Sequence, residues 1–259
     1  MIVMQVSGVK LVTEKLDALV VFGRGIEKSG ETWVPTAYLE CRGPSEQGGR
    51  FRAAGLTLTS ETAVVAGAHA NVLAAVHLLT DILAKGELPV LVFAAGRPVY
   101  LEKEHDELAE GDVLFNTLKA SIGLAGILSR LDVQIQRNNK NTFDDVRETL
   151  RMAVVRGFSH IAVISVLVHL PRIVEFHRHL VLHDLSFAKV SVDFRASEFV
   201  LLGKGPVASL LCLEDPSIQG PLNDAAVAKI LNSPAYRRTA DMEANGIQDF
   251  RDGRYRFSL

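Results

Sequence analysis

Short apolar runs alternate with stretches of helical periodicity along most of the chain. Four runs have the length and composition of buried strands, and they cover 17–22, 88–95, 131–136 and 161–167. The run at 161–167 is so uniformly apolar that we expect it at the centre of a sheet. Two later runs, 187–193 and 199–203, are also predicted to be strands.

Helical periodicity fills the segments between these runs. Apolar residues recur at helical spacing over 69–85 and 112–128, and further helices are predicted to begin at Thr142 and near His169. Gly86 and Gly157 mark two predicted helix ends. Thr142 and Asp145 have the spacing of a capping box, and Pro171 suits a first helical turn.

Strands that alternate with helices in this way predict βαβ crossovers and a parallel sheet, so the fold class is α/β with helices flanking the sheet. We expect one α/β domain over 1–210, interrupted by a loop-rich excursion over 28–60 that holds at most short strands. Residues 211–259 are expected to form a helical and polar C-terminal extension, with the last fifteen residues on the surface.

The composition of the chain limits the classes of partner that we expect it to bind. With 28 Lys and Arg against 30 Asp and Glu, the net charge of -2 disfavours nucleic acid. The two cysteines are far apart and are expected to be reduced in a cytoplasmic protein.

The uncharged stretch between Glu61 and Asp81 contains His69, Asn71 and His77, which favours a buried helix over a membrane span. No membrane partner is expected. The oligomeric state stays open, with a homo-oligomer among the alternatives.

Polar turns follow the predicted strands at four places. They are Gly23-Arg24-Gly25, Gly96-Arg97, 138–142 and 169–172. Open parallel sheets bind ligands beyond the carboxyl ends of their strands, where helix N-termini attract anions. We therefore expect a small anionic ligand that is phosphorylated, nucleotide-like or a carboxylate.

Motifs for more specific chemistry are missing from the sequence. The glycine turn has Lys28 where a dinucleotide fingerprint has its third glycine, and no phosphate-binding P-loop or hydrolase nucleophile elbow occurs. His177, His179 and His183 are interpreted as surface histidines, and no metal site is predicted.

His169 and Arg172 are the main candidates for chemistry. His169 is a candidate general acid or base, and Arg172 a candidate anion-binding group. The alternative is a capping histidine beside a solvated arginine. Likewise, the asparagines at 138, 139 and 141 suit either a ligand site or Asx turns.

The segment 139–172 resembles the YdcF/SanA/ElyC-like family of bacterial domains. The resemblance rests on the box Asn139-Lys140-Asn141-Thr142-Phe143-Asp144-Asp145, a strand that ends at Ser165-Val166, and His169-Leu170-Pro171-Arg172. Weaker likeness extends over about 17–195 and includes the turns that follow the first two strands. Four features depart from the family: Gln136-Arg137 replace an acidic residue, Asp144-Asp145 replace Glu-Asn, we find no glutamate at the start of the helix near Asp112, and the long segment 28–60 is extra.

The resemblance implies a Rossmann-like sheet and a nucleotide-type ligand such as S-adenosylmethionine. Two hypotheses follow. The first is a hydrolase or transferase for a small anionic substrate, with His169 transferring a proton; the second is a non-catalytic module that binds S-adenosylmethionine or a nucleotide. A purely structural role is a third alternative. The expected ligand-binding residues are Gly23, Arg24, Gly25, Gly96, Arg97, Asn139, Asn141, Thr142, Asp145, Ser165 and Arg172.

Overall fold

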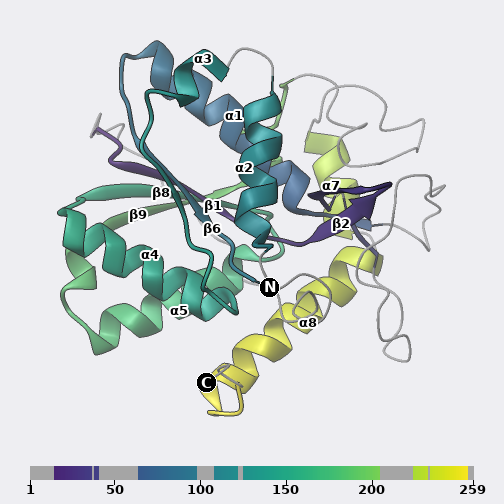
Figure 1. Ribbon diagram of the computed structural model, residues 1–259. Coiled ribbons are helices and arrows are strands. Elements are labelled where there is room, and N and C mark those ends of the chain that lie inside the picture. Colours follow the sequence, from purple (N-terminus) through teal and green to yellow (C-terminus); the bar gives the residue numbers. More distant parts are fainter. Residues whose placement is uncertain are drawn as a thin grey trace.

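The core of the protein is a five-stranded, entirely parallel sheet, as Figure 1 shows. The computed structural model describes residues 15–36, 38–40, 64–97, 108–121, 125–204, 224–232 and 234–255. The strands in spatial order are β7 (Val133–Ile135), β6 (Val90–Ala94), β1 (Ala18–Phe22), β8 (His160–Ser165) and β9 (Ser191–Ala196). The predicted α/β fold with a Rossmann-like parallel sheet is confirmed.

The chain reverses its direction of travel across the sheet between β1 and β8. From β1 it passes outward through β6 to β7, and it then returns to place β8 and β9 on the other side of β1. The carboxyl ends of β1 and β8 are therefore adjacent at a topological switch point. In open parallel sheets this is the position at which ligands bind.

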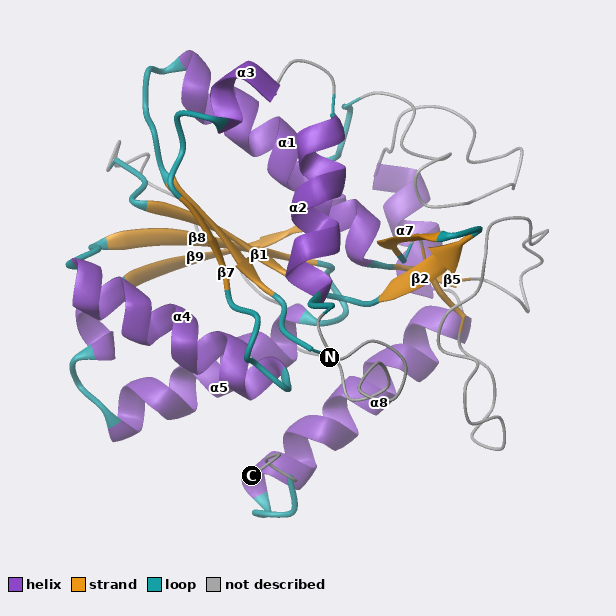
Figure 2. Cartoon of the chain, in the orientation of Figure 1, coloured by secondary structure: helices purple, strands orange, loops and turns teal. Residues whose placement is uncertain are grey.

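Successive residues of β1 point to opposite faces of the sheet, and both faces are covered by helices (Figure 2). Leu19 and Val21 pack in the core beneath α1 (Ala68–Ala84) and α2 (Glu110–Ala120). Val20 and Phe22 pack beneath α4 (Thr142–Arg156) and α5 (Leu170–His183). Because no face of β1 is left in water, its sequence is apolar throughout instead of alternating.

Glycines end two of the helices as the sequence predicts. Gly86 follows α1 with a φ of 77°, and Gly157 follows α4 with a φ of 68°. Gly25, in the turn after β1, has a φ of 104°, a backbone conformation that favours glycine. Pro171 lies in the first turn of α5, also as predicted.

Two predicted elements are wrong, and a third is a strand that begins later than predicted. The periodic segment 112–128 is not one helix, because α2 ends at Ala120 and a separate short helix, α3 (Ala125–Leu128), follows. The strand predicted at 187–193 begins later, since Phe187–Lys189 form a 3₁₀ turn before β9. The run at 199–203 is no strand: it overlaps α6 (Ser197–Val200) and the turn after it, where Leu201 packs into the core on the α1 side.

The excursion after β1 contains short strands. β2 (Ile26–Ser29) pairs antiparallel with β3 (Thr32–Pro35), and β4 (Tyr38–Glu40) pairs with β5 (Val64–Ala66) just before α1. This agrees with the short strands expected in the segment 28–60. Residues 41–63, most of that segment, lie outside the described part of the chain.

The C-terminal region forms two helices, α7 (Asp224–Asn232) and α8 (Pro234–Arg251). α8 packs against α5, and its Phe250 lies among Phe143, Phe176 and Tyr255. The expectation that the last fifteen residues form only a surface extension is wrong, because Phe250 is buried in the core on the α4 and α5 side. None of the helices in the described residues has the length and apolar character needed to cross a membrane.

Candidate functional site

Loops from separate parts of the chain meet beyond the carboxyl ends of the strands. The backbone N–H of Arg97, after β6, donates to the carbonyl of Asn139 at 2.9 Å, and the N–H of Glu110 donates to the carbonyl of Gly96 at 2.9 Å. Arg24, after β1, reaches His169, after β8, with 3.1 Å between Nη1 and Nδ1. All four turns singled out in the sequence therefore contribute to one edge of the sheet.

Four side chains form the centre of this edge, and we call them the anion cluster: Arg24, His169, Arg172 and Glu243. The Glu243 carboxylate lies 2.8 Å from Arg24 Nη1, 2.8 Å from Arg172 Nε and 3.3 Å from His169 Nδ1. His169 is 3% exposed and Glu243 is 4% exposed. Two cationic groups and an imidazole thus converge on one buried carboxylate.

Glu243 reaches the anion cluster from α8, whose buried stripe has helical spacing. Thr239, Glu243 and Phe250 are the buried residues along that stripe, and Gly246 lies between the last two. A side chain at Gly246 would place its Cβ 2.5 Å from Nη2 of Arg172. The glycine therefore allows the guanidinium to lie directly against α8.

The charges of the anion cluster shift the pKa of both titratable members. Burial alone would raise the pKa of Glu243, but His169, Arg24 and Arg172 hold it well below its usual range. Burial lowers the pKa of His169 to about 4; the carboxylate of Glu243 opposes this shift, while Arg24 adds to it. At neutral pH the cluster consists of two arginines, one carboxylate and a neutral histidine.

The two ring nitrogens of His169 have different partners. Nδ1 accepts from Arg24 when the proton is on Nε2, and Nε2 lies 3.4 Å from Thr142 Oγ1, to which it then donates. In the other tautomer Nδ1 donates to Glu243 Oε2 at 3.3 Å and Nε2 accepts from Thr142, so each tautomer gives Nδ1 one partner, either Arg24 or Glu243. The ring is thereby fixed between the end of β1 and the N-terminus of α4.

Glu110, the first residue of α2, binds the glycine turn after β1. Its Oε1 accepts from the N–H groups of Arg24 at 2.6 Å and Gly25 at 2.5 Å. Burial raises the pKa of Glu110 to about 7, against the lowering effect of those hydrogen bonds. A Cβ on Gly23 would lie 2.6 Å from the same carboxyl group. The backbone donors of Arg24 and Gly25 are therefore already used within the protein.

The position of Glu110 corrects one detail of the sequence comparison. We expected no glutamate at the start of the helix after the second strand, which we placed near Asp112. The helix instead begins with Glu110, two residues earlier.

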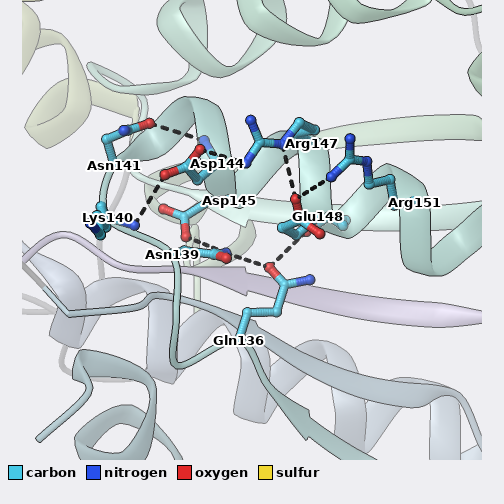
Figure 3. A network of polar contacts seen from close by, with 10 residues as sticks. Gln136, Asn139, Lys140, Asn141, Asp144, Asp145, Arg147, Glu148 and Arg151 are labelled. Atoms are coloured by element: carbon cyan, nitrogen blue, oxygen red, sulfur yellow. Dashed lines mark hydrogen bonds and ion pairs between the residues drawn. The ribbon is translucent and has the colours of Figure 1, made fainter. Parts of the chain in front are cut away.

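Asn139 and Asp145 lie at the start of α4 in a polar network that Figure 3 shows from close by. The Asn139 amide donates to Asp145 Oδ1 and to Gln136 Oε1, both at 2.9 Å. Burial raises the pKa of Asp145 well above its ordinary value; the bond from Asn139 lowers it, and the nearby charges of Glu110 and Asp144 raise it further.

The cap of α4 differs from the predicted capping box. Asn141 is the N-cap residue, and its Oδ1 accepts from the N–H of Asp144 at 3.0 Å (Figure 3). Thr142 is already the first residue of the helix. Asn141 and Asn139 therefore build the loop, as the Asx-turn interpretation proposes. Thr142 is left to contact His169.

Several predicted ligand-binding residues have buried polar atoms without a hydrogen-bond partner among the described residues. They are Ser165 Oγ, Arg97 Nε, Asn141 Nδ2, Arg24 Nε and Arg172 Nε, the last of which lies 2.8 Å from the Glu243 carboxylate as an ion pair without hydrogen-bond geometry. Buried donors are normally paired, so unpaired donors at one edge of a sheet are suited to a polar ligand.

Sequence reasoning missed Glu110, Glu198 and Glu243. Glu198, in α6 directly after β9, accepts from the N–H of Leu167 at 2.8 Å, and burial raises its pKa to about 7. Glu198 directly precedes the run 199–203, which was wrongly predicted to be a strand, and it was therefore not identified as a site residue. Glu243 could have been recognised in the sequence as a carboxylate within the stripe of helical spacing that contains Thr239 and Phe250 on α8.

His177 and His179 on α5 are half-buried, so their interpretation as surface histidines is wrong, and Nε2 of His177 is buried. His179 and His183 stack on each other with ring centroids 4.0 Å apart, and His183 is exposed, as predicted. Within the described ranges, no group of three or more His, Cys, Asp or Glu residues is arranged to hold a metal ion.

Comparison of the chain with models of protein families, with curated proteins and with solved structures finds no match.

Proposed function

We propose that this chain binds a small anionic ligand, phosphorylated or nucleotide-derived, at the carboxyl ends of β1 and β8, and that His169 transfers a proton to or from it. One observation carries the proposal: Arg24, Arg172 and His169 converge on a single carboxylate, Glu243. A cluster that holds an internal carboxylate in this way has the chemistry to bind the anionic group of a ligand.

The neighbouring groups support the same ligand class. The N-terminus of α4, with Thr142 in its first turn, supplies a positive dipole end beside His169. Unpaired donors on Arg97 and Asn141 provide further contacts for oxygen atoms. The resemblance to the YdcF/SanA/ElyC-like family favours a nucleotide or S-adenosylmethionine within that class.

A non-catalytic binding module is the second candidate function. One observation favours it: the pKa of His169 is about 4, well below neutral pH, and its ring is held by Arg24 and Thr142. A general base works best when its pKa is near the operating pH, so proton transfer requires a ligand charge that raises this pKa. Binding alone has no such requirement.

Native mass spectrometry of the protein purified from cells tests the ligand class directly. We expect a retained phosphorylated or nucleotide-type metabolite.

A thermal-shift screen of phosphate, nucleotides and S-adenosylmethionine should identify the same class, and calorimetry should show weaker binding by Arg172→Gln. The matched control is Arg151→Gln, since Arg151 lies on the exposed side of α4 and pairs with Glu148. Equal binding by both variants would contradict the proposal.

Product formation separates the two candidate functions. The bound molecule is incubated with the wild-type protein and with His169→Gln, and products are followed by mass spectrometry. Product from the wild type alone supports the enzyme with His169 as its proton-transfer group. Tight binding without product in either sample supports the binding module.

A further inference from the structure

We infer that Glu243 occupies the place of the ligand's anionic group, so that a phosphate-bearing ligand binds in competition with α8. This inference rests on the proposed function and adds a regulatory element to it. The groups proposed to bind the ligand, Arg24, Arg172 and His169, are the same groups that hold Glu243. One carboxylate and one external anion cannot occupy the same contacts.

Charge favours exchange of Glu243 for a phosphate. Two guanidinium groups face one carboxylate, and His169 is neutral, so the cluster keeps an excess of one positive charge. A phosphate dianion neutralises both arginines and also offers more acceptor oxygens than a carboxylate. The buried Nε of Arg24 has no hydrogen-bond partner in the described part of the chain and is suited to one of those oxygens.

The contacts that hold α8 in place can be broken when phosphate replaces Glu243. Burying a carboxylate carries a large desolvation cost, which the interactions of Glu243 with Arg24, Arg172 and His169 outweigh, so an anion that replaces Glu243 must take over these interactions. The outer ion pair between Arg251 of α8 and Glu175 of α5, at 2.7 Å, is largely exposed and adds little. Phe250, packed on Phe176 at a centroid distance of 4.7 Å, supplies the apolar part of the docking.

Competition makes a clear prediction for the Glu243→Gln variant. Removal of the internal carboxylate leaves two buried arginines without a counter-charge, so inorganic phosphate should bind at least about tenfold more tightly than to the wild type. Asp241→Asn is the matched control, because Asp241 lies on the exposed side of α8 and the variant changes net charge equally. Its phosphate affinity should equal that of the wild type.

A second variant and a second measurement cover the case in which Glu243→Gln does not fold. Phe250→Ala loosens α8 without altering the anion cluster and should also bind phosphate more tightly. In the unmodified chain, saturating phosphate should speed hydrogen exchange of the amides of α8, while those of β1 and β8 remain protected. Calorimetry with inorganic phosphate and hydrogen exchange read by mass spectrometry provide the data.

The outcomes separate this inference from the proposed function. If the wild type binds phosphate and Glu243→Gln binds it equally or more weakly, Glu243 is part of the binding site and the competition is contradicted. Slower exchange of α8 with phosphate would contradict it as well. If no form of the protein binds phosphate or any anionic compound of the screen, the proposed function itself is wrong.

Discussion

At the scale of single residues, the candidate site depends on how closely its loops approach one another. Gly96 lies directly against the backbone of Asn139, and Gly23 lies against the carboxyl group of Glu110. Both contacts leave no room for a side chain. The convergence of the four turns is therefore encoded in small residues as well as in the arginines and the histidine.

Replacement of Gly96 by alanine tests this close approach. Its Cβ would lie 1.9 Å from the carbonyl oxygen of Asn139, a backbone atom that cannot rotate away. We expect a loss of about 3 kcal/mol in the free energy of unfolding, at the upper end of the usual cost of overpacking. Urea denaturation measures this loss.

Gly126→Ala is the control for that substitution. Gly126 lies in α3, and a Cβ there would meet no described atom within 4 Å. We expect Gly126→Ala to be neutral or to stabilise the protein by up to about 1 kcal/mol, because alanine is the better helix former. A similar loss for both variants would show that the Asn139 contact is not the cause.

The site residues at the ends of strands were predictable, whereas Glu243, the carboxylate of the anion cluster, was not. Arg24 and His169 each follow an apolar run, and a parallel sheet places the ends of such runs at one edge. Glu243 follows no strand and no turn. Its burial agrees with the stripe that it shares with Thr239 and Phe250 on α8, but its partners depend on the docking of α8 onto α5, a tertiary contact that the stripe does not identify.

At the scale of elements, α4 connects the fold to the site. Its first residue, Thr142, contacts His169, while its N-cap, Asn141, accepts from the backbone of Asp144. The start of this helix was predicted to within one residue, but the N-cap was assigned to Thr142. Asparagine and threonine both cap helices well, so composition alone could not separate them.

Two alanine variants distinguish these assignments. Asn141→Ala should lower the free energy of unfolding by about 1 kcal/mol, the usual cost of losing an N-cap side chain. Thr142→Ala should cost less than about 0.5 kcal/mol, because alanine is favourable in a helix and only the 3.4 Å contact to His169 is lost. Chemical denaturation compares the two. A larger cost for Thr142→Ala would restore the predicted capping box.

The elements that sequence reasoning misassigned lie where burial is one-sided. β9 is an edge strand with mostly half-buried residues, so it lacks the uniform apolar run that marks β1 and β8. The apolar residues just after it pack as a helical turn against the α1 side of the core. A short apolar run fits either structure, and only the position of the sheet decides between them.

At the scale of the whole molecule, the buried titratable groups of the site determine how stability depends on pH. The pKa values of Glu110 and Glu198 are raised from 4.5 to about 7, so over this range the folded chain binds more protons than the unfolded chain. Their contribution to the free energy of unfolding therefore falls as pH rises. His169 acts in the opposite sense between pH 6.5 and about 4, because its pKa is lowered.

Between about pH 5 and 6.5 the raised pKa values of Glu110, Glu198 and Asp145 make the free energy of unfolding fall as pH rises. The lowered pKa values of histidines act in the opposite direction, and these histidines are His69, His77, His169, His177 and His179. Below about pH 4.5 the lowered pKa of Glu243 makes the free energy of unfolding fall as pH falls, since its ion pairs are lost on protonation.

Urea denaturation at half-unit steps from pH 4 to 8 measures this profile, and Glu110→Gln identifies its source. The amide oxygen of Gln still accepts from the N–H groups of Arg24 and Gly25, but the side chain no longer titrates. Between pH 5 and 6.5 the slope of the free energy of unfolding against pH should be more positive in Glu110→Gln than in the wild type, by up to about 1.4 kcal/mol per pH unit, because one carboxyl group with a raised pKa is removed. Equal slopes for the two proteins would mean that Glu110 is ionised in the folded protein over this range.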